Sequence, residues 1–132
     1  MRQVTEVTDS LLEAFGRLMP QLSPRLEAPS GERLRAVAAN PSAALFTAES
    51  GGAVVGALTL VWYDVPSGRK AWIEDVVVDA AARGFGAHAA AVGAGKVMLT
   101  SNPSRGAARR LYAKMGFKEA ETTVFACKTD TE

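Results

Sequence analysis

Two adjacent carboxylates, Glu74 and Asp75, interrupt an otherwise mostly apolar stretch over 71–78 that is rich in β-branched residues. This composition predicts a strand, and a carboxylate held on a strand can act as a general base that removes a proton from a nucleophile. Side chains alternate along a strand, so Glu74 and Asp75 are expected to point to opposite faces of the sheet. The alternative is a structural role for Glu74, in an ion pair with Arg69 or Lys70.

A glycine-containing loop follows this strand, and an alanine-rich stretch that predicts a helix comes next. The loop reads Arg83-Gly84-Phe85-Gly86-Ala87-His88. A strand, a glycine loop and a helix N-terminus together present free backbone N–H groups to phosphate oxygens, and Arg83 adds a positive charge. A plain tight turn is the alternative interpretation of the two glycines.

The same loop also fits the dinucleotide-binding pattern G-x-G-x-x-A over residues 84–89. That pattern needs an acidic residue about 20 positions further on to hold the ribose. The chain has no Asp or Glu between Asp79 and Glu119. It is also too short for a doubly wound sheet, so we exclude a nicotinamide-dependent enzyme.

Charge is distributed unevenly along this chain of 132 residues, whose net charge is only +1. The near-zero total argues against a nucleic-acid partner, and the length predicts a single domain over residues 1–132. Residues 80–118 contain no Asp or Glu and form an acid-free window. This window favours a small anionic ligand, and the alternative is that its basic residues cluster by chance. Seven basic residues occupy that window: Arg83, Lys96, Arg105, Arg109, Arg110, Lys114 and Lys118.

Single copies of cysteine and histidine limit the chemistry further. Cys127 alone cannot form an internal disulfide, and His88 alone cannot form a paired-histidine zinc site, so no metal is expected. The longest apolar run, over 53–62, is about half the length of a membrane span. The N-terminus has no apolar signal-peptide core. We therefore expect a cytoplasmic protein without membrane contact.

The predicted elements describe a mixed α+β fold. Thr8 caps a helix that Pro20 and Pro24 end, and Ser30 caps a second helix that Asn40-Pro41 stops. Short turns between three central strands, one of them at Ser50-Gly51-Gly52, predict antiparallel pairing, and a strand–helix–strand crossover adds a parallel strand. The strands are expected at 4–7, 43–49, 53–63, 71–78, 96–100 and 122–128, with a loop at 64–70 and a helix from Pro103-Ser104 to Gly116.

Three segments taken together, WIEDVVVD, RGFGA and LTSNPSRGAARRLYAKMGF, resemble the GNAT N-acetyltransferase superfamily. The likeness runs from about Ala43 to Lys128. Within the superfamily, the Ile-Glu-Asp-Val strand looks like that of small-amine and amino-sugar N-acetyltransferases. The resemblance implies the GNAT fold: a twisted, mostly antiparallel sheet with one parallel, splayed strand pair and about four helices.

By this resemblance the cosubstrate is acetyl-CoA and the acceptor is the primary amine of a small molecule. The resemblance implies Glu74 as the base, directly or through water, and Tyr112 as the general acid or the hydrogen-bond donor to the thiolate. The alternative for Tyr112 is a core aromatic on the apolar face of its helix. Asp75 or water alone remain the alternatives for the base. The cofactor-binding residues that it implies are Val76, Val77 and Val78 on the strand edge, the loop Arg83, Gly84, Phe85, Gly86, Ala87 and His88, and then Asn102 and Arg105.

The chain departs from the family pattern at several positions. His88 stands where glycine or alanine is usual, and Thr100 stands where the amino-sugar branch carries an acid. Only 13 residues, Ala87 to Leu99, form the crossover, so an unusually short helix is expected there. The alternative function is therefore a catalytically weak or inactive GNAT-like domain that binds CoA as a sensor or binds another protein. The resemblance also allows a homodimer.

Overall fold

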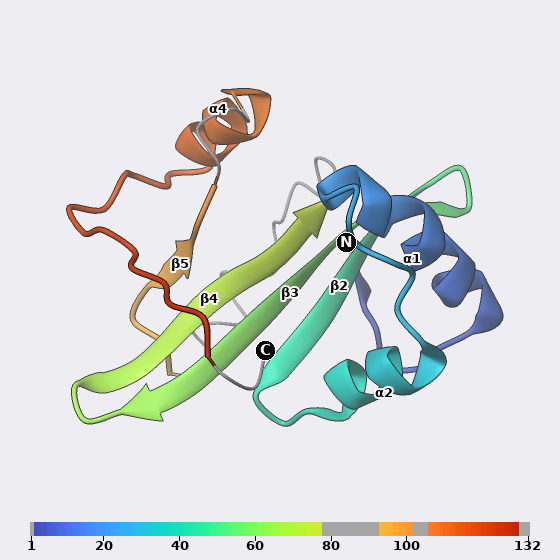
Figure 1. Cartoon of the computed structure of the whole chain (residues 1–132), viewed down its shortest axis with the longest axis horizontal. Helices are drawn as coiled ribbons and strands as arrows, with labels where there is room; N and C mark the ends of the chain where they lie inside the picture. The colour runs from blue at the N-terminus through green and yellow to red at the C-terminus, as the bar shows by residue number, and fades with distance from the viewer. Residues whose placement is uncertain (1, 78–92, 102–105, 130–132) are drawn as a thin grey trace. The chain divides into compact units, whose positions relative to one another are not determined.

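A computed structural model describes residues 2–77, 93–101 and 106–129. The chain forms two compact units, Met1–Thr100 and Ser101–Glu132. Figure 1 shows the elements along the chain. Their bounds are β1 Arg2–Gln3, α1 Asp9–Leu22, α2 Gly31–Ala39, β2 Ala43–Ser50, β3 Ala53–Val65, β4 Gly68–Val77 and β5 Val97–Leu99 in the first unit, and α4 Gly106–Lys114 in the second.

The first unit is built on a five-stranded sheet in the order β1-β2-β3-β4-β5. The first three pairings are antiparallel, and β4 pairs with β5 in parallel over Ala71–Ile73 and Val97–Leu99. This mixed α+β arrangement confirms the expected fold class. The expected short crossover helix lies outside the described residues.

Side-chain caps begin α1 and α2, as predicted. The Leu11 amide donates to the Thr8 hydroxyl at 3.2 Å, and the Arg33 amide donates to the Ser30 hydroxyl at 3.0 Å. The prediction that Pro20 ends the first helix is wrong, because Pro20 lies inside α1. Proline has no N–H to donate to the residue 16 carbonyl, yet the helix continues to Leu22 and its cap.

The hairpin between β3 and β4 is longer than predicted. Residues 64–70, expected as a loop, are strand except for a turn at residues 66–67. Asp64 and Arg69 stand directly opposite each other, and the guanidinium donates to both carboxylate oxygens at 2.7 and 2.8 Å. This paired contact adds a cross-strand interaction of opposite charges, which extends the ladder to Val65 and Gly68.

The Asp64–Arg69 pair gives a titration prediction. The Arg69 hydrogen bond, aided by its charge, holds the pKa of Asp64 below the usual aspartate value. A carboxyl with a lowered pKa stabilises the fold above its unfolded pKa, and this contribution is lost as pH falls through the folded value. Arg69→Gln should therefore raise the Asp64 pKa, as followed by carboxyl NMR titration. Lys70→Gln is the matched control, and an equal effect of both would contradict the paired geometry.

The core of the first unit lies between one face of the sheet and helices α1 and α2. Phe15 and Leu18 of α1 and Leu34 of α2 pack with Leu45 and Ala57 of the sheet. The opposite face is also buried at the centre, where Leu60 is 0% exposed. Both faces of β3 are thus fixed by packing, so a change of register would move apolar side chains out of the core.

Two terminal strands differ from prediction. The expected strand at 4–7 is instead β1 at Arg2–Gln3, although the Val4 amide still donates to the Leu45 carbonyl at 2.7 Å. The expected closing strand at 122–128 is wrong for this structure, because these residues form no regular element. Phe125 is 91% exposed there. A β-prone composition needs a neighbouring strand before it becomes a ladder.

Candidate functional site

A β-bulge interrupts the regular pairing of β4 next to Glu74, the predicted base. The register passes from Thr59 opposite Glu74 to Ala57 opposite Val77, so β4 carries one extra residue. Asp75 has a φ of 51°, and among the described residues it is the one non-glycine with a positive φ. Aspartate tolerates this left-handed conformation better than β-branched residues do. Strict alternation fails over this segment, because Glu74 and Val77, three residues apart, share one face of the sheet. The opposite faces expected for Glu74 and Asp75 stay a prediction.

Glu74 is exposed on β4 and makes no hydrogen bond or ion pair with any residue that the structure describes. The structural alternative, a pair with Arg69, is wrong because Arg69 holds Asp64. Lys70 makes no ion pair with Glu74 either. An unpaired carboxylate keeps its lone pairs available for a proton, which is the geometry a general base needs.

Strand β4 extends beyond the strand that pairs with it in parallel. β5 meets β4 only as far as Ile73, while β4 continues to Val77. Within the described part of the chain, the Glu74–Val77 edge therefore has no strand partner on the β5 side. Unpaired N–H and C=O groups on a strand edge can receive an extended ligand that has amides of its own. Val76 and Val77, two predicted cofactor contacts, lie on this segment.

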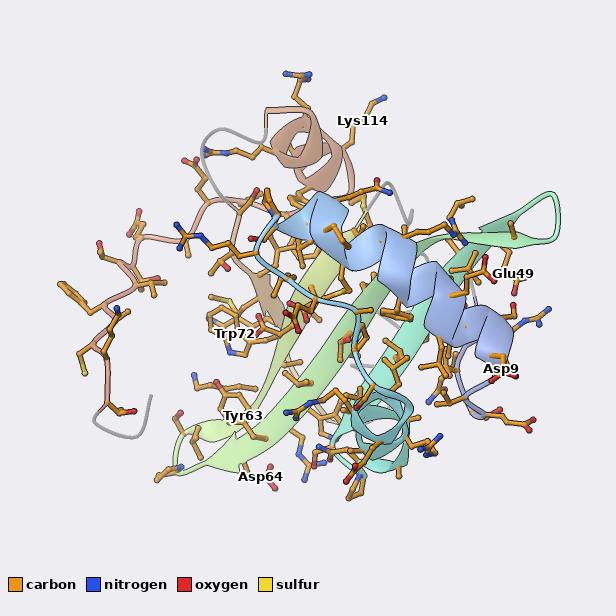
Figure 2. All side chains as sticks on the ribbon, turned by 45° about the vertical axis from the view of Figure 1, so that its right-hand side comes forward. Asp9, Glu49, Tyr63, Asp64, Trp72 and Lys114 are labelled. Carbon is orange, nitrogen blue, oxygen red and sulfur yellow. The ribbon has the colours of Figure 1, made fainter. Side chains whose placement is uncertain are left out.

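Three aromatic residues near the β3–β4 hairpin have different environments. Trp62 is buried in the core, opposite Ala71. Tyr63 and Trp72 lie on the helix-facing side of the sheet, where the indole N–H donates to the Tyr63 hydroxyl at 2.8 Å. Figure 2 shows these two side chains next to each other. Tyr63 and Trp72 therefore form a surface pair, whereas Trp62 belongs to the core.

Tyr112, the predicted acid, lies on α4 in the second unit. The helix ends as predicted: Gly116 has a φ of 97°, and the Phe117 amide donates to the Tyr112 carbonyl at 2.9 Å. The Gly116 amide donates to Ala113, which completes a Schellman motif. The Tyr112 and Phe117 rings meet edge to face with centroids 6.1 Å apart. The turn therefore fixes the ring position of Tyr112.

Basic residues of the acid-free window add positive charge to the second unit. Arg109, Arg110 and Lys114 lie on α4, and Arg109 is paired with Glu119, the first acid after the window. Arg110 and Lys114 make no ion pair with a described residue. Two unpaired cations on one helix suit an anionic ligand.

Most of the predicted cofactor contacts lie outside the described residues. These are Val78, Arg83, Gly84, Phe85, Gly86, Ala87, His88, Asn102 and Arg105. Sequence reasoning missed two features of the described part, the bulge at Asp75 and the Tyr63–Trp72 hydrogen bond. The bulge has a weak sequence signal, since Glu-Asp is unfavourable inside a strand. The hydrogen bond had none, because it depends on cross-strand register.

The described residues contain neither a membrane-spanning helix nor a cluster of metal-binding side chains. No described helix is both long enough and apolar enough to cross a membrane. The described ranges hold no group of three or more His, Cys, Asp or Glu residues arranged to bind a metal ion. Cys127 is exposed with a free thiol.

Comparison with solved structures finds the same fold in several proteins. A probable acetyltransferase covers 100% of both chains with a TM-score of 0.76 and 18% identity. A transcriptional regulator from Bacillus halodurans C-125 has a TM-score of 0.71 and 23% identity, over 96% of this chain and 100% of that one. AAC(6')-Iy in complex with the bisubstrate analogue CoA-S-monomethyl-acetylneamine has a TM-score of 0.65 and 20% identity, over 97% and 96%.

Comparison by sequence gives different results for individual curated proteins and for protein families. No curated protein matches the chain significantly. The family model described as the acetyltransferase (GNAT) family matches residues 6–117, which include every element from α1 to α4. This match covers most of the chain, and the parallel β4–β5 pair agrees with the fold that the resemblance implies. The chain belongs to the GNAT family of acetyltransferases.

Proposed function

We propose that this protein is an N-acetyltransferase that transfers the acetyl group of acetyl-CoA to the primary amine of a small molecule. The observation that carries the proposal is the end of β4 in a chain of this family. A bulge, an exposed carboxylate without a described partner and an unpaired strand edge coincide over Glu74–Val77. Direct attack in a ternary complex needs a base and an acyl donor side by side, and this segment can supply both positions.

The strand edge supports binding of the pantetheine arm. This arm is extended and contains two amides, so it can pair with backbone groups as an added strand does. Val76 and Val77 are the described residues that we assign to it, and Val78 continues the edge in the sequence. The arm would place the thioester near Glu74, and a backbone N–H near Val76 would polarise its carbonyl.

The basic window supports binding of the phosphate groups. We assign the pyrophosphate to the backbone amides of residues 83–88 and to the Arg83 charge, with further contacts from Asn102 and Arg105. Carboxylates are absent over residues 80–118. Their absence avoids repulsion of a ligand that carries several negative charges.

The proposed reaction begins with an ammonium group that gives one proton to Glu74, directly or through water. The free amine attacks the thioester carbonyl, a C–N bond forms, and the carbonyl electrons move to oxygen. When the carbonyl re-forms, the C–S bond breaks and the thiolate accepts a proton from Tyr112. The attacking nitrogen loses one of its two protons to solvent and keeps the other as the amide N–H. Glu74 then releases its proton and Tyr112 takes one up, so the net products are the acetamide, CoA thiol and one proton.

Calorimetric titration with acetyl-CoA, followed by a thiol-release assay with a panel of amines, tests the proposal. We expect binding at micromolar to millimolar ligand and release of one CoA thiol for each amide formed. Thiol release without an amide product would indicate hydrolysis instead. Binding without transfer to any amine would support the alternative, a CoA-binding domain, and no binding at millimolar ligand would contradict both.

A further inference from the structure

We propose that the acceptor is a primary monoamine with a flat apolar or aromatic body and a hydrogen-bond acceptor at the end away from the amine. The inference rests on the proposed acetyltransferase function. Trp72, Tyr63 and Lys70 are the residues that would select this substrate, by contacts with the body and with its far end.

Three side chains form a row on one face of β4. The register places Glu74 opposite Thr59, Trp72 opposite Val61, and Lys70 opposite Tyr63. Residues two apart on a strand are spaced by about 7 Å, so Lys70 is about 13 Å from Glu74 along the strand. A carboxylate, an indole and an ammonium thus follow one another on the side of the sheet that also carries α1 and α2.

The aromatic pair in the middle of this row is held in a defined geometry. The Trp72 indole N–H donates to the Tyr63 hydroxyl at 2.8 Å, and Tyr63 remains 43% exposed. An indole nitrogen only donates, so the Tyr63 oxygen is the acceptor and its own hydrogen stays available. No described residue takes that hydrogen. The pair therefore offers an apolar surface and one donor to a ligand.

The two ends of the row carry opposite charges. Glu74 makes no ion pair with a described residue, and the same holds for Lys70. The neighbouring cation, Arg69, is paired with Asp64 on the other face of the hairpin. Lys70 is therefore the unpaired charge beside Tyr63. An ammonium fits the Glu74 end, and a hydroxyl, carbonyl or carboxylate fits the Lys70 and Tyr63 end.

The same charges work against a polycationic acceptor. An amino sugar with several ammonium groups would bring a second positive charge toward Lys70, where like charges repel. It would also cover the Trp72 surface with a polar skeleton that is itself charged. The row thus favours one amine and one polar or anionic end.

A set of matched amines tests this inference at saturating acetyl-CoA. The set consists of phenethylamine, tyramine, 4-(2-aminoethyl)benzoate and the polyamine neamine. We expect kcat/KM to be highest for the benzoate, lower for tyramine and phenethylamine, and lowest for neamine. A highest kcat/KM for neamine would overturn the inference while leaving the acetyltransferase function intact.

Substitutions then test which residues cause the preference among these amines. Trp72→Ala should raise KM for the aromatic amines about tenfold with little change in kcat, and Trp72→Phe should raise it less. Tyr63→Phe and Lys70→Gln should each reduce the advantage of the benzoate over phenethylamine. Arg69→Gln is the matched control, because it removes a charge from the same hairpin on the opposite face.

Thermal melts by circular dichroism identify any variant that loses its fold, and Trp72→Phe then provides the test in place of Trp72→Ala. Unchanged KM values in Trp72→Phe and Lys70→Gln would overturn the inference. Binding of acetyl-CoA without transfer to any amine of the set or of a broader panel would overturn the proposed function, and the inference with it.

Discussion

Replacing Glu74 by glutamine should lower kcat for amine acetylation by about 10²- to 10⁴-fold, the usual contribution of a general base. The amide keeps the volume of the carboxylate but cannot accept the proton of the ammonium group. Glu74 is exposed and has no hydrogen-bond or ion-pair partner among the described residues, so the substitution should leave the melting temperature unchanged. Steady-state kinetics with acetyl-CoA and an accepted amine measure the loss.

Asp75→Asn is the matched control for this prediction. It removes the neighbouring negative charge, and asparagine, like aspartate, tolerates the left-handed conformation with a φ of 51°. We expect Asp75→Asn to retain most of the wild-type kcat. A large loss in Asp75→Asn, together with a normal rate in Glu74→Gln, would move the base to Asp75. Normal rates in both would leave water as the base.

The second large effect is expected for Tyr112→Phe, which should lower kcat about tenfold to a hundredfold without raising KM for acetyl-CoA. The loss is smaller than for Glu74 because a thiol with a pKa of about 8.5 is already a fair leaving group near neutral pH. The variant keeps the ring that meets Phe117 edge to face, so the helix end should remain intact.

A structural role for Tyr112 predicts a different pattern. Tyr112→Leu removes both the hydroxyl and the ring contact with Phe117, and it should lower the melting temperature as well as kcat. If Tyr112→Phe kept the full rate and Tyr112→Leu lost only stability, the acid assignment would be wrong.

The features that the sequence predicted correctly depend on neighbours along the chain. The caps at Thr8 and Ser30, the turn at Gly51-Gly52 and the helix end at Gly116 each involve a few successive residues. A hydroxyl that accepts an amide three residues later needs no distant partner. Two successive glycines with φ of 59° and 81° suit a tight hairpin turn. Each of these local interactions can therefore be predicted from a short stretch of the sequence.

The features that the sequence did not predict depend on partners far along the chain. Residues 64–70 become strand because Asp64 and Arg69 meet across the hairpin. The predicted strand at 122–128 lacks such a partner, and these residues form no ladder. Propensity alone treats a strand as a property of its own residues, whereas a ladder requires hydrogen bonds from a neighbour.

The same distinction between local and long-range determinants applies to the candidate site. The sequence by itself determined the chemical groups, namely the carboxylates at Glu74 and Asp75, Tyr112 before a Gly-Phe pair, and a window without acids. Only the tertiary structure decided that the strand bulges after Glu74, that Arg69 holds Asp64 instead of Glu74, and that β4 continues past β5. The sequence specifies the residue types, but the register between strands determines how these residues are oriented and paired. Packing on both faces of the sheet fixes that register.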